Sequence, residues 1–408
     1  MIKLSSSKKI LSGEVSLESS KSVSNRILLI KALSNQNFKI ANLSSSDDTA
    51  LMLKFIENYN KIKEIDCHHA GTTLRFLTAF LSVSKGNWIL KGSERMHERP
   101  IGPLVECINK IGGNIKYIGK RNYPPLNVTG KNIEGGSVDI KGDISSQFIS
   151  ALLLIAPSLK KGLTINIKSK ILSRPYIHMT LSLMEKMGII YKWSNNVISI
   201  QSQSYVCNDF VVENDWSAAS FWYSFVALSK SAEIKIPLLQ KKSIQGDSKV
   251  ADIFKSLGVS TQYLKDKIII KKNNLLENNV KIDLSDYPDL SLPIITTCAG
   301  LGIDAFIYGL ESLKHKESDR LSMIKNELAK FNIVINIDSS SAKINGNQII
   351  KNPDEIIKTH NDHRIPMSIA PLCMKTNYIK FDNKTVVNKS YPKFWNDLEI
   401  MGMQCKEY

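Results

Sequence analysis

The strongest constraint on the fold of this chain is a repeated stop signal. Five times, an amphipathic segment ends at a glycine or asparagine, and a short alternating strand pattern follows. The stop residues are Gly112, Gly188, Gly258, Asn332 and Gly402, separated by 76, 70, 74 and 70 residues. Glycine and asparagine accept the left-handed conformation that commonly ends a helix. With a weaker copy near Phe55, the spacing predicts about six helix-then-strand units of an α/β protein.

Six such units divide naturally into two groups of three, and 408 residues are too many for one ordinary core. Between Tyr205 and Ala218 the pattern predicts a strand that leaves one unit and a capped helix that opens the next. We therefore expect two lobes, residues 1–20 with 214–408 and residues 21–213, with the active site in the cleft between them. Two linkers beside one site would let the lobes close on a ligand.

Composition excludes several classes of protein. The most apolar long stretch, from Ser291 to Leu310, contains Pro293 and Asp304, which favours a buried core over a membrane span. The first residues lack the apolar segment of a secretory signal. None of the six cysteines lies in a C-x-x-C or zinc-binding pattern, which favours free thiols in a reducing compartment. We expect a cytoplasmic protein.

The formal net charge of +16 indicates an anionic partner, such as nucleic acid, an acidic membrane or a small phosphorylated substrate. The lysines are scattered as pairs, for example Lys160-Lys161, and do not form a basic stripe with interleaved aromatic residues. Nucleic-acid binding therefore remains the disfavoured alternative. It would show as a salt-dependent affinity for single-stranded oligonucleotides.

The first cluster of polar residues runs from Glu18 to Arg26, E-S-S-K-S-V-S-N-R. Lys21 and Arg26 are expected on either side of a serine-rich turn that opens an apolar helix, with Ser19, Ser20 and Ser22 as candidate N-caps. Free amides at a helix start, together with a lysine and an arginine, suit a phosphate or carboxylate. Alone, such a segment is more often a solvated cap.

Further polar clusters interrupt the pattern in the first half. They are H-H-A-G-T-T-L-R at 68–75, E-R-M-H-E-R-P at 94–100, G-D-I-S-S-Q-F at 142–148 and S-R-P-Y at 173–176. Arg99 precedes a proline and is expected to be extended, and Ser145 is a plausible N-cap. The adjacent His68 and His69 suggest a metal, but no third ligand has matching spacing. We predict no metal site.

Charged clusters also open helices in the second half. Asp289 lies in D-Y-P-D-L-S-L-P, and Lys389 lies in N-K-S-Y-P-K-F. The segments K-H-K-E-S-D-R at 314–320 and N-D-H-R at 361–364 are each expected to begin a helix. A lone carboxylate there would be a cap or an ion pair. Carboxylates beside bound ions can instead have shifted pKa values and transfer protons.

Seven segments, in order over nearly the whole chain, resemble those of the EPSP synthase family: K-S-V-S-N-R, A-G-T-T-L-R, E-R-P-I-G, S-S-Q-F, S-R-P-Y-I, K-E-S-D-R and N-D-H-R. The resemblance implies two lobes, each of three βαβαββ units around a pseudo-threefold axis. It implies transfer of the enolpyruvyl group of phosphoenolpyruvate to the 5-hydroxyl of 3-phosphoshikimate, without metal or organic cofactor. The implied partners are these small molecules, with no nucleic acid and no membrane, and we expect a monomer.

The resemblance also implies roles for individual residues. Contacts to 3-phosphoshikimate are expected from Lys21, Ser22, Arg26, Ser145, Ser146, Gln147, Ser173, Tyr176, Asp289 and Lys316. Contacts to phosphoenolpyruvate are expected from Lys21, Gly71, Thr72, Arg99, Gln147, Arg320, Arg364 and Lys389. The implied catalytic group is Asp289, Glu317, Lys21, His363 and Lys389. In it, Asp289 accepts the hydroxyl proton and Glu317 handles protons at the methylene carbon.

The chain departs from the family pattern at the phosphate pockets. His69 stands where the family commonly has asparagine, Glu18-Ser19-Ser20 replaces P-G-S before Lys21, and Ser312 replaces an asparagine of some members. Glyphosate, which mimics phosphoenolpyruvate, is expected to inhibit because Gly71 leaves its space unfilled. The rival within the superfamily, the enolpyruvyl transferase that acts on UDP-N-acetylglucosamine, uses a loop cysteine, and residues 85–99 contain none.

Overall fold

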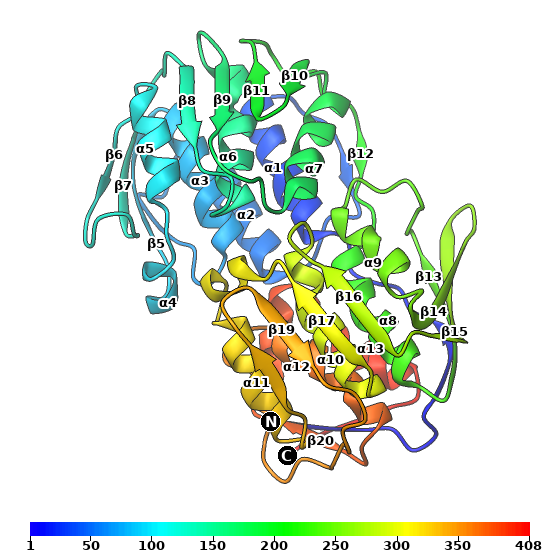
Figure 1. Ribbon diagram of the computed structural model, residues 1–408. Helices are drawn as coiled ribbons and strands as arrows, with labels where there is room; N and C mark the ends of the chain where they lie inside the picture. The colour runs from blue at the N-terminus through cyan, green and yellow to red at the C-terminus, as the bar shows by residue number, and fades with distance from the viewer. The chain divides into compact units, whose positions relative to one another are not determined.

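The computed structural model describes residues 1–408 (Figure 1). The chain forms two compact units, which we call the C-terminal unit (Met1–Ser20 with Glu213–Tyr408) and the N-terminal unit (Lys21–Val212). The chain re-enters the C-terminal unit at Glu213, one residue before the position 214 expected from the sequence. The segments at which the chain crosses are paired, because Ser19 and Asn214 form an antiparallel bridge and the Ser20 N–H donates to the Glu213 carbonyl at 2.9 Å.

The N-terminal unit contains two complete βαβαββ repeats. The first consists of β4 (Glu64–Asp66), α3 (Gly71–Val83), β5 (Gly86–Lys91), α5 (Gly102–Lys110), β6 (Ile115–Tyr117) and β7 (Leu126–Gly130). The second consists of β8 (Gly136–Ile140), α6 (Ser146–Ile155), β9 (Leu163–Ile167), α7 (Arg174–Lys186), β10 (Tyr191–Ser194) and β11 (Val197–Ile200). The sheet orders correspond, β4-β5-β7-β6 and β8-β9-β11-β10, and in each only the first two strands are parallel.

The third repeat of this unit is shortened. Its two strands, β12 (Phe210–Val211) and β3 (Ile40–Ala41), are parallel neighbours and come from opposite ends of the unit. Its helices are α1 (Lys21–Ser34) and α2 (Asp47–Asn58). After α2 the chain passes through a turn directly into β4, so the usual hairpin is missing. The weak copy near Phe55 in the sequence corresponds to this shortened repeat.

The C-terminal unit has one repeat that is continuous in the sequence and two that are completed by the N-terminal strands. The continuous one contains β16 (Asn279–Asp283), α10 (Ser291–Leu301), β17 (Asp304–Tyr308), α11 (Arg320–Ala329), β18 (Ile335–Ile337) and β19 (Ser341–Ile344). In the next, β2 (Ile10–Glu14) pairs in parallel with β13 (Ser231–Pro237). The remaining elements of that repeat are α8 (Trp216–Leu228), α9 (Val250–Ile253), β14 (Leu257–Tyr263) and β15 (Lys267–Leu276).

The last repeat is closed by the first strand of the chain. Strand β1 (Ile2–Ser5) lies between β20 (Ile379–Phe381) and β21 (Gln404–Glu407) and is antiparallel to both. Its helices are α12 (Arg364–Ile369) and α13 (Phe394–Ile400). Ile357 forms a parallel bridge with Phe381, in the place that the first strand occupies in other repeats. The C-terminal unit therefore has three βαβαββ repeats, as the family resemblance implies.

The first helix of each repeat forms the centre of its unit. Helices α1, α3 and α6 contact one another in the N-terminal unit, as do α8, α10 and α12 in the C-terminal unit, and the sheets lie outside them (Figure 1). Helix α8 is the clearest case, because only Ser217 of its residues is not buried. A helix that is hydrophobic all round belongs in a core. The outer strands instead alternate, as in β13, whose even positions face the helices.

The five stop residues all have the predicted left-handed conformation. Their φ angles are 106° at Gly112, 79° at Gly188 and Gly258, 63° at Asn332 and 84° at Gly402. In each case the next residue donates its N–H to the carbonyl five residues back, for example Ile189 to Met184 at 3.0 Å. This is the six-to-one bond of the Schellman motif. The same helix ending recurs in five of the six repeats, so the prediction made from spacing is confirmed.

No helix in residues 1–408 combines the length and apolar character needed to span a bilayer. The stretch from Ser291 to Leu310 instead forms α10 and β17, both in the core of the C-terminal unit. All six cysteines are free.

Candidate active site

The predicted site residues gather at the N-termini of helices within each unit. In the N-terminal unit, the starts of α3 and α6 touch, because Gln147 Nε2 donates to Thr72 Oγ1 at 3.0 Å. In the C-terminal unit, the starts of α10 and α12 touch, because Arg364 Nη2 lies 3.1 Å from Asp289 Oδ2. Unpaired backbone N–H groups and the helix dipole make such ends favourable for anions. The packing of three inner helices thus brings separate sequence motifs together.

Lys21 is the first residue of α1, and its Nζ lies 3.2 Å from Oδ2 of the buried Asp48, at the start of α2. The sequence-based expectation of a turn between Lys21 and Arg26 is wrong, because both residues lie in the helix. The difference has a physical reason: the serines that suggested a turn include Ser24, which is fully buried and accepts the N–H of Ser44 through its Oγ at 3.1 Å. Ser22 is half-buried in the first turn.

Arg26 is 2% exposed and links α1 to α6 and α7. Its Nε donates to Thr180 Oγ1 at 2.7 Å, its Nη1 to the Ser22 carbonyl at 2.9 Å, and its Nη2 to Ser150 Oγ at 3.4 Å. Burial lowers the pKa of Arg26 to about 10, while Tyr176 acts in the opposite direction. The guanidinium therefore braces the helices that carry the other predicted residues of this unit.

Gly71 and Arg99 lie against one another at the start of α3. A Cβ at Gly71 would fall 2.7 Å from Arg99 Nη1 and 2.8 Å from Arg75 Nη1, so only glycine leaves these guanidinium groups in place. Arg75 Nη1 donates to the Gly71 carbonyl at 2.9 Å, and Nη2 donates to the Pro100 carbonyl at 3.1 Å. Arg75 therefore holds together the α3 start and the segment that carries Arg99, which is 6% exposed.

The serine-rich segments form the starts of α6 and α7. Ser145 is the N-cap of α6, as predicted, and its Oγ accepts the N–H of Gln147 at 3.3 Å. Ser146 and Ser173 are 9% and 8% exposed. Ser173 precedes α7 with φ 56° and ψ 36°, a left-handed conformation unusual for serine. Tyr176, in the first turn of α7, is half-buried.

The two adjacent histidines do not form a metal cluster. His69 Nδ1 lies 2.9 Å from Ser93 Oγ, while His68 is well exposed with Nδ1 3.5 Å from Asp66 Oδ1. Within residues 1–408, no group of three or more histidine, cysteine, aspartate or glutamate side chains is arranged to hold a metal ion.

Arg320 is the centre of the charged cluster in the C-terminal unit. Its side chain is 2% exposed and lies at the start of α11, after the N-cap Asp319. It contacts three carboxylates: Asp362 through Nε at 2.8 Å, Glu317 through Nη2 at 2.8 Å, and Asp289 through Nη1 at 3.2 Å. Burial would lower the pKa of Arg320, but these carboxylates outweigh it and hold that pKa above its ordinary value. The guanidinium is permanently charged.

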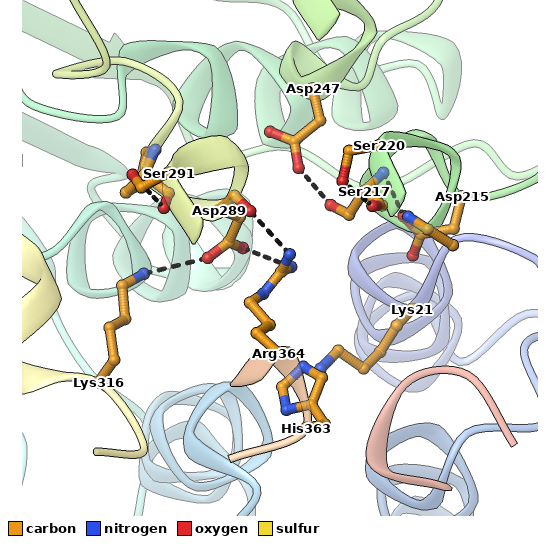
Figure 2. Close-up of polar contacts among 12 residues, drawn as sticks. Lys21, Asp215, Ser217, Ser220, Asp247, Asp289, Ser291, Lys316, His363 and Arg364 are labelled. Atoms are coloured by element: carbon orange, nitrogen blue, oxygen red, sulfur yellow. Dashed lines mark hydrogen bonds and ion pairs between the residues drawn. The ribbon is translucent and has the colours of Figure 1, made fainter. Parts of the chain in front are cut away.

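Asp289 lies between Lys316 and Arg364, which both contact its carboxylate (Figure 2). Burial favours its neutral form, but Arg364, Lys316 and Arg320 outweigh burial and hold its pKa well below the usual range. Lys316 Nζ lies 3.6 Å from Oδ1, and Arg364 also donates to the Asp289 backbone carbonyl at 2.8 Å. Asp289 is therefore ionised at neutral pH.

The remaining predicted residues of this unit lie around the same cluster. Glu317 Oε1 is 3.0 Å from Nζ of Lys389, whose side chain is 9% exposed. His363 is 2% exposed, and its Nδ1 is 3.7 Å from Asp362 Oδ1. The structure thus brings together the catalytic and binding candidates of the C-terminal unit: Asp289, Lys316, Glu317, Arg320, His363, Arg364 and Lys389. As predicted, α11 begins at Arg320 and α12 at Arg364.

Sequence reasoning assigned no role to three residues that organise these groups. Asp362 is fully buried and accepts from Ser318 Oγ, Arg320 Nε and the Arg364 N–H. Asp48 pairs with Lys21, and Arg75 braces the segment before Pro100. Asp362 and Arg75 lie within motifs noted in the sequence, where neighbouring charged residues could have indicated that they take part in the site. Asp48 lies outside the motifs and offered none.

Comparisons with known proteins agree on one family. The EPSP synthase (3-phosphoshikimate 1-carboxyvinyltransferase) family model matches residues 6–66 and 58–398. A 3-phosphoshikimate 1-carboxyvinyltransferase of Bacteroides fragilis YCH46 is 41% identical over 394 residues, covering 96% of each chain. One of Vibrio atlanticus is 32% identical over 420 residues, covering 96% of this chain and 97% of its own. The solved EPSP synthase of Acinetobacter baumannii is 18% identical with a TM-score of 0.80, covers 99% of its own chain and all of this one, and shows the same fold.

Proposed function

Because the chain belongs to the EPSP synthase family, we propose that it transfers the enolpyruvyl group of phosphoenolpyruvate to the 5-hydroxyl of 3-phosphoshikimate. Phosphate is released, and the product is 5-enolpyruvylshikimate 3-phosphate, on the route to chorismate and the aromatic amino acids. The family match over most of the chain supports this reaction. The rival substrate UDP-N-acetylglucosamine gains no support, because residues 85–99 contain no cysteine.

The single observation that carries the proposal is the shared guanidinium of Arg320. It holds Asp289 and Glu317, the two carboxylates proposed to move protons, at 3.2 Å and 2.8 Å. With Asp362 there are three carboxylates in this cluster, and the cations are Arg320, Arg364, Lys316 and Lys389. Four positive charges face three negative charges when Glu317 is ionised, and two when Glu317 carries the proton that it transfers, so an anion is attracted in either state. Fixed cations of this kind stabilise charge without reorganising during the reaction.

We assign substrate contacts to both units. The proposed 3-phosphoshikimate group is Lys21, Ser22, Arg26, Ser145, Ser146, Gln147, Ser173, Tyr176, Asp289 and Lys316. The proposed phosphoenolpyruvate group is Lys21, Gly71, Thr72, Arg99, Gln147, Arg320, Arg364 and Lys389. The substrates together carry two phosphates and two carboxylates, so holding them in contact requires many fixed positive charges.

The reaction proceeds by addition and elimination. Protonation of the methylene carbon of phosphoenolpyruvate makes its second carbon electrophilic, and the 5-hydroxyl oxygen adds there while Asp289 accepts the hydroxyl proton. Glu317 supplies the proton at the methylene carbon, with Lys389 beside it at 3.0 Å. In the elimination, the new methyl group loses a proton to Glu317 as the carbon–oxygen bond to phosphate breaks. Asp289 gives the hydroxyl proton up to the departing phosphate, so both carboxyl groups return to their starting states. Lys21 and His363 complete the proposed catalytic group.

The proposal includes a monomeric, cytoplasmic enzyme whose partners are its two small-molecule substrates. Membership of a biosynthetic enzyme family supports the location and the substrate class. The scattered lysines support a small anion over nucleic acid as the partner of the +16 charge.

The experiment that tests the function is a coupled phosphate-release assay. The purified chain is incubated with both substrates and with each substrate omitted in turn. Phosphate release that requires both 3-phosphoshikimate and phosphoenolpyruvate is the expected result, without added metal. Release from phosphoenolpyruvate alone, or no release with both, would contradict the proposal. Adding single-stranded oligonucleotide tests the alternative, which predicts salt-dependent binding.

A further inference from the structure

A buried carboxylate at the far end of α11 holds the segment that leads to Asp362. Glu327 is 2% exposed. Its Oε2 accepts from Lys330 Nζ at 2.8 Å and from the Lys358 N–H at 2.9 Å, and its Oε1 lies 2.8 Å from His360 Nε2. A buried carboxylate is costly unless its oxygens are paired. Here two of the three pairings fasten residues 358–360 to the helix.

The segment held in this way contains an unusual turn. His360 and Asn361 are consecutive left-handed residues, with φ angles of 53° and 54°. Of the two, histidine is the residue for which this conformation is less favourable, because asparagine adopts it more readily. Such a conformation persists only where the surroundings fix it. The His360 side chain is bonded to Glu327 at the first of these two positions.

The same helix holds the chain on both sides of the turn. Before it, Glu327 near the end of α11 binds His360. After it, Arg320 at the start of α11 binds the Asp362 carboxylate through Nε at 2.8 Å and Nη2 at 3.3 Å. The N–H of Asp362 also donates to the Thr359 carbonyl at 2.9 Å, across the turn. The position of Asp362 is therefore set by α11 through two separate attachments.

A displacement of this turn would move both arginines of the charged cluster. Asp362 Oδ1 accepts the Arg364 N–H at 3.1 Å, and Asp362 Oδ2 accepts from Arg320 Nε. Arg364 in turn donates to the Asp289 carbonyl at 2.8 Å. The path from Glu327 to Asp289 is thus an unbroken series of hydrogen bonds and one short turn.

We propose that Glu327 and His360 are positioning residues, whose pair fixes the turn at 360–361 and thereby orients Arg320 and Arg364 toward the phosphoenolpyruvate anion. This inference rests on the proposed function, which assigns both arginines to that substrate. Glu327 bonds to Lys330, the Lys358 N–H and His360, not to either arginine, so the pair acts on the arginines through Asp362.

Two substitutions at His360 separate the side-chain bond from the backbone turn. His360→Asn tolerates the left-handed conformation well, but its amide is too short to reach Glu327. His360→Gln is less suited to that conformation, but its longer amide restores a donor near the position of the imidazole Nε2. The proposal predicts that H360N raises KM for phosphoenolpyruvate by about tenfold, as for loss of one hydrogen bond to a charged group. H360Q should recover most of that loss.

If His360 matters only for the left-handed backbone conformation, the opposite order is expected: H360N should behave as wild type, and H360Q should show the raised KM. The readouts are KM for each substrate, kcat and the thermal midpoint. KM for 3-phosphoshikimate and kcat should stay within about threefold of wild type in both variants, because a shift in two arginines alters one substrate's binding most. Glu327→Ala should raise KM for phosphoenolpyruvate at least as much, because it also releases the Lys358 N–H. Adding H360N to it should change KM little, because the His360 side chain acts through Glu327.

The matched control is Glu355→Gln. Glu355 is 76% exposed and lies 4.0 Å from the same Lys330, so its loss should change no kinetic constant. If the wild-type chain is active but KM for phosphoenolpyruvate in H360N equals the wild-type value, the inference is overturned and the proposed function stands. The same holds if this KM is higher in H360Q than in H360N. Equal increases in KM for both substrates also overturn it. Absence of turnover in the wild type overturns the proposed function, and the inference with it.

Discussion

Arg320 Nε lies 2.8 Å from Oδ2 of Asp362, and both side chains are almost completely excluded from solvent. Asp362 is the one member of the charged cluster of the C-terminal unit to which the proposed function gives neither a substrate contact nor a catalytic role. Its two oxygens are shared among Ser318, Arg320 and the backbone N–H of Arg364. The pair therefore fixes the start of α11 relative to the start of α12.

We expect Asp362→Asn to impair both stability and turnover. Breaking a buried pair by removing one charge typically costs about 3–5 kcal/mol, because the remaining charge stays buried. Loss of orientation at Arg320 should lower kcat/KM by about 100-fold, the scale of one misplaced stabilising donor. Urea unfolding and steady-state kinetics measure the two effects. The exposed Asp354→Asn serves as control, and a D362N variant with wild-type stability would contradict the structural role.

Asp289→Asn should retain substrate binding and lose turnover. The substitution keeps the size of the side chain and removes the proton acceptor, a change that typically lowers rates by about 100- to 10,000-fold. The expected result is a large fall in kcat with a much smaller change in the binding of 3-phosphoshikimate, measured by isothermal titration. Normal kcat in this variant would remove Asp289 from its proposed role.

The dependence of stability on pH should also change in Asp289→Asn. The pKa of Asp289 is depressed in the folded chain, against about 3.9 for an unfolded aspartate, so its ionised form stabilises the fold above that value. This contribution is present at pH 7 and is lost as pH falls from about 4 toward the folded pKa. The difference in unfolding free energy between wild type and D289N should therefore be constant from neutral pH to about 5 and should narrow in acid. A difference that widens in acid would contradict the direction of the shift.

The repeats were predictable because each ends in the same local chemistry. The left-handed stop residues, from Gly112 to Gly402, require glycine or asparagine whatever packs around them, so their spacing survives in the sequence. The shortened third repeat left only a weak signal near Phe55, because it has no hairpin after α2. Strands β1 and β2 are neighbours in the sequence but belong to separate sheets. Each pairs with residues more than 200 positions away, and no local pattern encodes such a pairing.

Within the site, sequence could identify residue types at helix starts but not their partners. The serines beside Lys21 suggested a turn, whereas burial of Ser24 and Arg26 makes this segment helical. Asp48 could not be connected with Lys21, because their contact depends on the packing of α1 against α2. The grouping of Arg320 with Asp289 and Asp362, which come from separate segments, likewise required the tertiary structure.

Arg26→Lys should chiefly affect stability. The guanidinium donates to three side chains or carbonyls on α1, α6 and α7, and lysine cannot reproduce its planar arrangement of donors. Leaving Thr180 and its neighbours without these donors should lower the unfolding free energy by about 2–3 kcal/mol. Chemical denaturation measures this, with the surface change Lys39→Arg as control. A rise in KM for 3-phosphoshikimate is also expected, because Arg26 belongs to the proposed contact group of that substrate. A variant of normal stability would contradict the bracing role.

Gly71→Ala should weaken inhibition by glyphosate, which we expect to bind in place of phosphoenolpyruvate. The added methyl would lie 2.7 Å from Arg99 Nη1 and 2.8 Å from Arg75 Nη1, so both guanidinium groups must move. Arg75 also bonds the Gly71 carbonyl, so the shift extends to the segment ending at Pro100. A bulkier inhibitor tolerates the lost space less well than the substrate does.

The inhibition constant should therefore rise by about tenfold or more, the effect of about 1.4 kcal/mol, with a smaller rise in KM for phosphoenolpyruvate. Gly119→Ala, at an open position where an added Cβ would meet only Pro125 Cδ at 3.8 Å, is the control. Unchanged wild-type turnover at millimolar glyphosate would refute the premise, and equal inhibition of G71A and wild type would refute the steric account.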